Sequence, residues 1–423
     1  GLVGISFGSV YKAFCSDCDP DVAFRDAMRL YKGRQYLEAS YEFGRVAVKW
    51  SAFRKNDSAT LYKGRSLEKL HLHDAARKAY ESGLSNHESS PLAARFHLQL
   101  LKIAYKDTAW TEARRNFEAI QRLSAAHPDV PVQMDAAYVM GQVLFAQGRL
   151  AQAREQLESV RAGDPNHPWA QFTLGLIHAR ENRHDEARQA FESIVAKQPV
   201  NKSETELQDA AETMLGHVLY SLPEPQLVRA VQLYAQVPPG SVHYEEAQLA
   251  TAWCFVRNAA ANPKYWEDVQ RHVANVSRRS PLYPERLLVE GYSHVSHGEC
   301  DSASRSFQTI LDIAGEDSLS SETIRRHEAQ QASLVAMRRD LSDKVYRLTL
   351  QLPSEPVLAE RQAIRDRIGR IAKGFDDQAR FHDWLARHAR FRSARERIVK
   401  DATYGLASSK NCRDGAKTES GGF

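Results

Sequence analysis

A pattern of two short amphipathic helices, joined by a polar turn, recurs along most of this chain and limits the folds that it can adopt. Its best-formed copy is 168–199, PWAQFTLGLIHARENRHDEARQAFESIVAKQP. Apolar residues recur at intervals of three or four on each side of the turn, which predicts two helices, the second ending at Pro199. The small residues Gly175 and Ala187 stand where two antiparallel helices would cross closely. The pattern therefore predicts a stack of helix pairs.

The same series of small and aromatic residues returns in register. Lys32, Lys69 and Lys106 show that the first three copies share a period of 37 residues. The predicted copies are 21–51, 57–90, 94–126, 134–165, 168–199, 209–238, 244–281 (a degenerate one) and 284–315. The pattern resembles the tetratricopeptide repeat, a helix–turn–helix unit with a Gly, Ala, aromatic and Pro series. This resemblance implies an all-α fold, a right-handed superhelix of about eight units over 21–315.

The regions outside the predicted array carry no repeat. Residues 1–20 are expected to be a leader or the remainder of a secretory signal, because their start is mildly apolar. A C-terminal helical segment, 316–405, is predicted to cap or extend the array, with breaks at Pro353 and Gly374. Residues 406–423 are polar and glycine-rich, which predicts a disordered tail.

Composition excludes some classes of protein and partner. No run of 18 or more apolar residues occurs, so no membrane-spanning helix is expected. The net charge of +4 is small for 423 residues and does not indicate a polyelectrolyte partner for the whole chain. Five scattered cysteines do not predict a disulfide framework.

Two junctions between repeats carry a narrower resemblance. VPPGSVHYEEAQLATAW and SRRSPLYPERLLVEGY are similar to linkers in bacterial cell-envelope tetratricopeptide proteins. This resemblance implies a bacterial protein and favours the periplasm or cell envelope over the cytoplasm.

Candidate partner-binding residues lie on the first helix of each pair, which lines the concave wall of such a stack. In the first three repeats this predicted cationic face consists of Lys32, Arg65, Lys69, Arg95, Lys102, Tyr105 and Lys106. A column of cations suits an acidic peptide or a carboxyl terminus, because charge-assisted hydrogen bonds are the stronger ones. The alternative is a solvated face whose lysines were copied with the repeat.

A second candidate group is aromatic. Trp169 and Phe172 stand on the first helix of the best-formed repeat, where aromatic side chains could anchor apolar residues of a peptide. The alternative is that they pack between successive repeats. Together the two groups predict a non-catalytic scaffold or adaptor with a protein or peptide partner.

Other chemistry finds little support in the sequence. His294, His297 and Cys300 lack a fourth ligand on a shared face, and Cys15 and Cys18 form a lone C-x-x-C, so no metal is expected. No phosphate-binding, hydrolase or kinase motif occurs, so neither a cofactor nor catalytic residues are expected. The C-terminal segment is rich in arginine around Trp384 and Phe391, which is typical of a solvated capping helix. Assembly in a bacterial cell envelope through this segment, and nucleic-acid binding, remain as alternatives.

Overall fold

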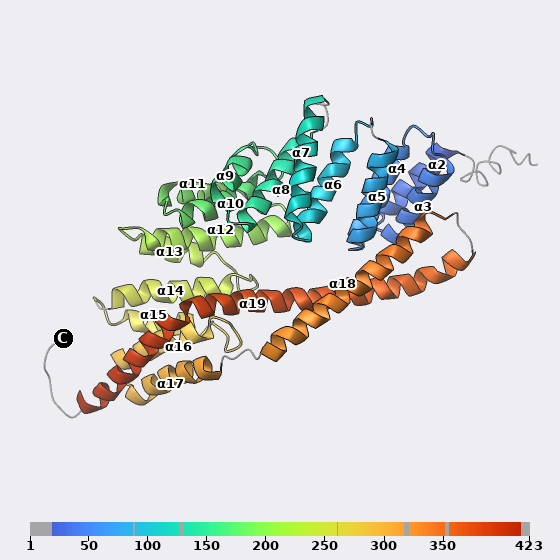
Figure 1. The fold of residues 1–423 in the computed structure, drawn as a ribbon. Coiled ribbons are helices and arrows are strands. Elements are labelled where there is room, and N and C mark those ends of the chain that lie inside the picture. Colours follow the sequence, from blue (N-terminus) through green and yellow to red (C-terminus); the bar gives the residue numbers. More distant parts are fainter. Residues whose placement is uncertain are drawn as a thin grey trace, which may run out of the picture. The chain divides into compact units, whose positions relative to one another are not determined.

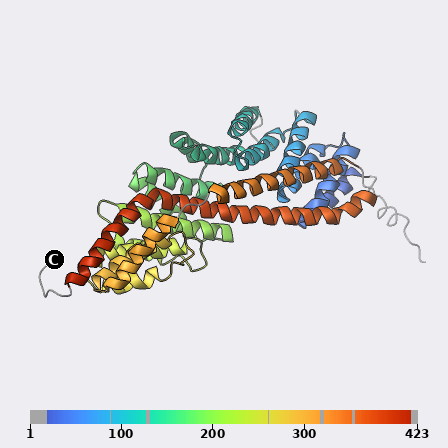
Figure 2. The same ribbon diagram turned by 60° about the horizontal axis from the view of Figure 1, so that its bottom comes forward.

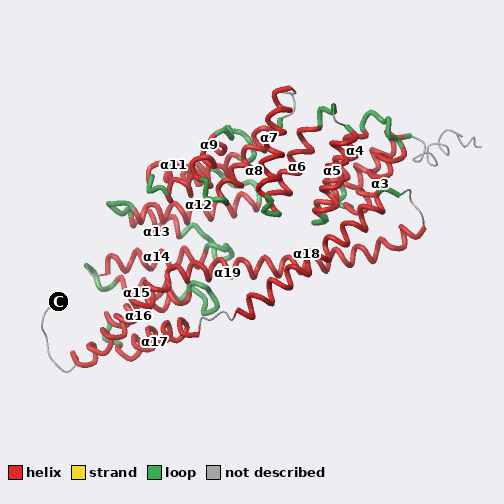
Figure 3. Tube along the Cα trace, viewed as in Figure 1, coloured by secondary structure: helices red, strands yellow, loops and turns green. Residues whose placement is uncertain are grey.

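The computed structural model describes residues 19–87, 89–126, 131–259, 261–316, 321–351 and 355–415. These residues are helical or lie in short connections, and the described part of the chain contains no strand (Figures 1 and 3). Two compact units share them: unit 1 holds the described residues up to 164 together with 325–379, and unit 2 holds 165–324 together with the remainder from 380. Each unit is described by itself.

Both units contain consecutive antiparallel helix pairs. In unit 1 the pairs are α2 (Pro20–Lys32) with α3 (Tyr36–Lys49), α4 (Asn56–Lys69) with α5 (His73–Asn86), α6 (Ala93–Lys106) with α7 (Trp110–Ala126), and α8 (Gln133–Ala146) with α9 (Leu150–Glu158). In unit 2 they are α10 (His167–Arg180) with α11 (His184–Val195), α12 (Lys202–Ser221) with α13 (Leu227–Tyr234), α14 (Tyr244–Ala259) with α15 (Tyr265–Val273), and α16 (Tyr283–Ser296) with α17 (Cys300–Glu316). The predicted all-α stack of helix pairs is confirmed.

Small residues on the first helices allow the close helix crossings that the sequence pattern predicted. A Cβ atom at Gly175 would lie 2.7 Å from the ring of Phe191, and one at Gly64 would lie 2.2 Å from the ring of Tyr80. Both distances are far below van der Waals contact, so any larger residue would push the second helix away. At Gly64, Gly175, Gly216 and Gly291 an aromatic side chain of the second helix fills the space that the glycine leaves, whereas Leu157 fills it at Gly141.

The C-terminal part of the chain forms two long helices instead of the three that were predicted. They are α18 (Ser321–Thr349) and α19 (Glu355–Gly415), and α19 runs through Gly374 without a break. A Cβ at Gly374 would lie 2.5 Å from Cδ2 of Leu334, so this glycine allows α19 to cross α18 closely. Figures 1 and 2 show the two helices side by side over this stretch. The predicted break at Gly374 was wrong, because the sequence alone does not distinguish a glycine that allows two helices to pack closely from a glycine that ends a helix.

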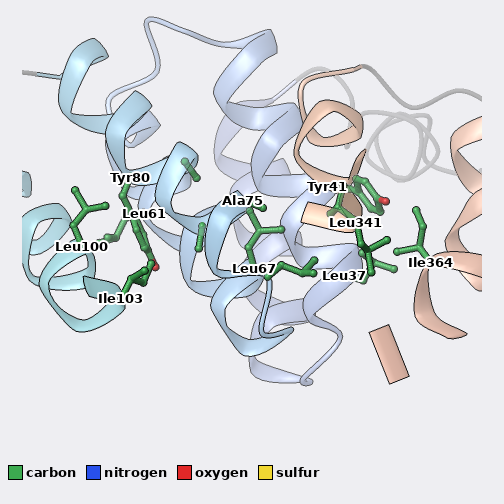
Figure 4. Close-up of a cluster of buried hydrophobic side chains, with 14 of the residues drawn as sticks. Leu37, Tyr41, Leu61, Leu67, Ala75, Tyr80, Leu100, Ile103, Leu341 and Ile364 are labelled. Atoms are coloured by element: carbon green, nitrogen blue, oxygen red, sulfur yellow. The ribbon is translucent and has the colours of Figure 1, made fainter. Parts of the chain in front are cut away.

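The predicted C-terminal segment 316–405 is divided between the two units. In unit 1, α18 and the first part of α19 enter the hydrophobic core. Four of their side chains share a buried cluster with α3 and α5, namely Leu341, Val345, Ile364 and Ile371 (Figure 4). The approach is close, because a Cβ at Gly44 of α3 would lie 2.2 Å from the carbonyl oxygen of Thr349.

In unit 2, the end of α19 covers the last helix pair. Ile398 and Ala402 are buried with Leu287, Leu288 and Phe307 in one cluster, and Leu406 packs against it. A disulfide joins Cys300, the first residue of α17, to Cys412, with the two Cα atoms 5.8 Å apart. The cysteine spacing alone did not predict this bond.

Two further predictions meet the limits of the described residues. The tail predicted from residue 406 is helical up to Gly415, whereas 416–423 and the predicted leader up to residue 18 lie outside the described residues. The side chains of 381–393, which include Trp384 and Phe391, are also outside the description. Among the helices that are described, none combines the length and the apolar character needed to cross a membrane.

Candidate functional site

The predicted cationic face belongs to unit 1, on the first helices α2, α4 and α6. Lys32, Lys69 and Lys106 are exposed, and each is the last residue of its helix. A cation at this position is stabilised by the partial negative charge of the helix carboxyl end. The lysine column therefore has a structural cause that does not depend on a partner.

One acid on the cationic face reduces its positive charge. Glu68 lies 3.7 Å from Nζ of Lys106 and accepts a hydrogen bond of 2.6 Å from the hydroxyl of Tyr80. By contrast, Lys32, Lys69 and Lys102 form no ion pair with a carboxylate in the described part of the chain. These three lysines are the cations that remain for a partner.

The other members of the cationic face are partly engaged. The guanidinium of Arg65 lies over the ring of Tyr62 at 5.3 Å, and Tyr62 meets Tyr31 edge to face at 5.2 Å. Burial raises the pKa of Tyr31 above its ordinary value. Arg95 is half-buried, whereas Tyr105 is 36% exposed. The face thus combines exposed lysines with fixed aromatic rings.

The predicted aromatic pair lies in unit 2, on α10. Phe172 packs edge to face on Phe191 of the same repeat at 5.6 Å, and both Phe172 and Trp169 are half-buried against the core of unit 2. Much of their surface is therefore used for packing within unit 2. The cationic face and this pair belong to different units, so we treat them as separate sites.

A pocket in unit 2 was not predicted from the sequence. It has a volume of about 220 Å³ and lies between the first helices α12, α14 and α16. Its lining residues are His217, Tyr220, Tyr234, Glu246, Leu249, Ala250, Trp253, Leu282 and Glu285. We call it the groove pocket.

Hydrogen bonds hold the polar side chains of the groove pocket. Nδ1 of His217 lies 2.9 Å from the hydroxyl of Tyr234, and its Nε2 lies 3.2 Å from Glu246. The indole N–H of Trp253 donates to Glu285 over 2.8 Å. His217 and Trp253 each directly follow the small residue of their helix, Gly216 or Ala252, and this shared position was the signal that the sequence offered.

A charged cluster in unit 1 connects α18 to the second and third repeats. Arg77 donates to Asp107 over 2.8 Å, and Arg338 of α18 lies 3.9 Å from Asp74 and 3.8 Å from Asp107. Burial opposes ionisation of Asp107, but His73, whose Nδ1 lies 3.7 Å away, the hydrogen bond from Arg77 and the charge of Arg338 hold its pKa below the usual value. The cluster therefore has a structural role, fixing α18 to the repeats.

His294, His297 and Cys300, the metal-ligand types that stand close together in the sequence, have other partners in the structure. Nδ1 of His294 lies 2.6 Å from Glu299, and Cys300 is part of the disulfide. Across the described ranges, no group of three or more His, Cys, Asp or Glu side chains is placed to hold a metal ion. Cys15 and Cys18 lie outside these ranges.

Comparisons with known proteins give one family match and several similar solved structures. Residues 61–131 and 138–202 match the family described as tetratricopeptide repeat. A comparison with curated proteins gives no match. Similar solved structures include PilW, described as a widely conserved type IV pilus biogenesis factor, at 19% identity and a TM-score of 0.40, covering 60% of this chain and 97% of that one.

Two further solved structures are comparable. PilF of Pseudomonas aeruginosa has 13% identity and a TM-score of 0.41, with 54% of this chain and 93% of that chain covered. The apo form of RapI has 11% identity and a TM-score of 0.49, with 81% and 98% covered. At these values the structural likenesses carry no argument about function. The family match identifies residues 61–131 and 138–202 as tetratricopeptide repeats, and the glycine–aromatic contacts of Gly216 with Tyr234 and of Gly291 with Phe307 continue the same pattern beyond them.

Proposed function

We propose that this chain is a non-catalytic scaffold or adaptor that binds a partner polypeptide on the first-helix faces of its repeats. In unit 1 the partner segment is acidic or ends in a carboxylate. The observation that carries this proposal is the set of lysines, Lys32, Lys69 and Lys102, that have no carboxylate partner in the described part of the chain. Lysine ammonium groups on neighbouring first helices can donate charge-assisted hydrogen bonds to carboxylates of an extended segment.

Charge reversal of two of these lysines is expected to weaken binding. In the variant Lys69→Glu/Lys102→Glu, affinity for a labelled acidic peptide with a free carboxyl terminus should fall by at least about tenfold, since tenfold corresponds to only about 1.4 kcal/mol. Most of the salt dependence should disappear as well, because two attractive charges become repulsive. Fluorescence anisotropy over a series of salt concentrations measures both effects.

A matched control distinguishes a loss of charge on the cationic face from a change in the net charge of the whole chain. Arg114 and Arg115 are exposed on α7, a second helix of unit 1, so Arg114→Glu/Arg115→Glu makes the same change of net charge away from the cationic face. This control should bind the acidic peptide like the wild type. Equal binding by the wild type and the Lys69/Lys102 variant would refute the proposed site.

A second candidate function is assembly within a bacterial cell envelope through the C-terminal helices. The disulfide between Cys300 and Cys412 favours it, because disulfides persist in oxidising compartments such as the periplasm. Deleting α18 and α19 would not test this function, since both helices belong to the cores of the units. Reversing the exposed charges of Arg370 and Lys373 on α19 is the better test, because it should abolish envelope association without affecting peptide binding.

A further inference from the structure

The groove pocket presents negative charge beside aromatic rings. Glu246 of α14 and Glu285 of α16 both line it, together with the rings of Tyr220 and Trp253. Its volume of about 220 Å³ has room for one long side chain, not for a folded element. Because all lining residues belong to unit 2, the pocket exists within that unit alone.

The two carboxylates are oriented before any partner binds. The indole N–H of Trp253 holds Glu285 over 2.8 Å, and His217 holds Glu246 at 3.2 Å. Such fixed acceptors need little reorganisation on binding, which lowers the cost of ordering them. In the described ranges, Glu285 forms no ion pair with a lysine or arginine of the chain itself.

The charged groups around the pocket favour a cation. His243 lies 3.8 Å from Glu246, and Arg257 contacts one ring of the pocket. Arg257 stacks over Tyr220 at 5.2 Å and donates to the carbonyl of Tyr220 over 3.3 Å, so it occupies one ring at the rim. Within the described ranges, Glu285 is therefore the pocket carboxylate that no lysine or arginine of the chain neutralises.

A guanidinium group fits this combination better than an ammonium group. It is planar and stacks on an aromatic ring while its N–H groups, which point in several directions, reach carboxylates on both sides. We propose that the groove pocket binds the guanidinium group of an arginine side chain in an extended segment of a partner protein. The inference rests on the proposed function, namely that the first-helix faces bind polypeptide, and it names the chemistry of the partner in unit 2.

The test compares blocked pentapeptides with the full chain by isothermal titration. The probes are Ser-Ala-Arg-Ala-Ser, the same peptide with lysine, and the same peptide with citrulline, which has nearly the shape of arginine but no charge. We expect the arginine peptide to bind about tenfold more tightly than the citrulline peptide, with the lysine peptide between them. Tenfold corresponds to a single charge-assisted contact. Equal affinity for arginine and citrulline, or for arginine and lysine, would overturn the assignment.

Two matched double variants locate the effect. Glu246→Gln/Glu285→Gln removes both pocket charges and should reduce the preference for arginine over citrulline to about onefold. Glu224→Gln/Glu267→Gln makes the same charge change at two exposed positions of unit 2 outside the pocket, and should keep the preference. Melting temperatures of both variants report on folding. If the pocket variant melts at a clearly lower temperature than the wild type, Trp253→Phe is tested in its place. This variant keeps an aromatic ring but removes the N–H that donates to Glu285, so it should also reduce the preference for arginine.

The acidic peptide assay of unit 1, run on the same variants, distinguishes this inference from the proposed function. If the acidic peptide binds normally and no arginine preference exists, the inference alone fails. If the acidic peptide does not bind but the arginine peptide is clearly preferred, the cationic site is contradicted and the assignment of the pocket is retained. If the pocket variant keeps the full arginine preference, the pocket is not the binding site.

Discussion

Replacing Phe307 by alanine is expected to lower the free energy of unfolding by about 3–5 kcal/mol, the range for a fully buried phenylalanine. Phe307 is 0% exposed and lies between two glycines from different helices. A Cβ at Gly291 of α16 or at Gly405 of α19 would lie 2.5 Å from its ring, and Tyr292 meets it edge to face at 5.5 Å. Truncation therefore leaves a cavity that three helices cannot close by small shifts.

Urea unfolding followed by circular dichroism measures this loss. Phe255→Ala is a suitable control in the same unit, because Phe255 is only half-buried and stacks on His272 at the surface of α14. The control should cost clearly less than the Phe307 variant. A loss below about 1 kcal/mol for Phe307→Ala would mean that α19 does not pack on this ring as described.

The repeats could be predicted because their determinants are local. A helix pair needs apolar residues at helical spacing and a small residue facing an aromatic one, and all of these fall within one unit of the period. Gly175 and Phe191 meet as their positions in the repeat suggest. The same logic placed the lysines of the cationic face on first helices, although it missed that Lys32, Lys69 and Lys106 also end these helices.

The C-terminal helices could not be placed because their partners are distant in sequence. Gly44 does not face an aromatic side chain of its own repeat. A glycine is needed there because the backbone of Thr349 packs against it. Similarly, Arg338 pairs with Asp74 and Asp107 across more than two hundred residues. Nothing periodic relates these positions, so a single sequence contains no signal for their contact.

The groove pocket was missed for a related reason. Its carboxylates share one repeat position near the start of their first helices, whereas His217 and Trp253 share another, directly after the small residue. The site therefore joins two different repeat positions, and neither position alone indicates that the two meet. Adjacent repeats then place Glu285 beside Trp253 and Glu246 beside His217.

Loss of the disulfide is the second large effect expected. Cys300 and Cys412 are separated by 112 residues, and closing a loop of that length stabilises the folded chain by about 4–5 kcal/mol in the chain-entropy estimate, with about 2–4 kcal/mol typical of measured cases. Cys412→Ser should therefore lower the melting temperature and allow the last turns of α19 to separate from α17. Peptide mapping without reductant should show the two cysteine peptides linked in the wild type.

The double variant Cys300→Ser/Cys412→Ser supplies the control for this prediction. Because both substitutions remove the same bond, the double variant should be about as stable as either single variant, a clear departure from additivity. Reductant should destabilise the wild type to the level of these variants and should leave the variants unchanged. If reductant leaves the wild-type melting temperature unchanged while mapping shows the linked peptides intact beforehand, the bond does not hold α19 to the last repeat. The packing around Phe307 would then account for that attachment by itself.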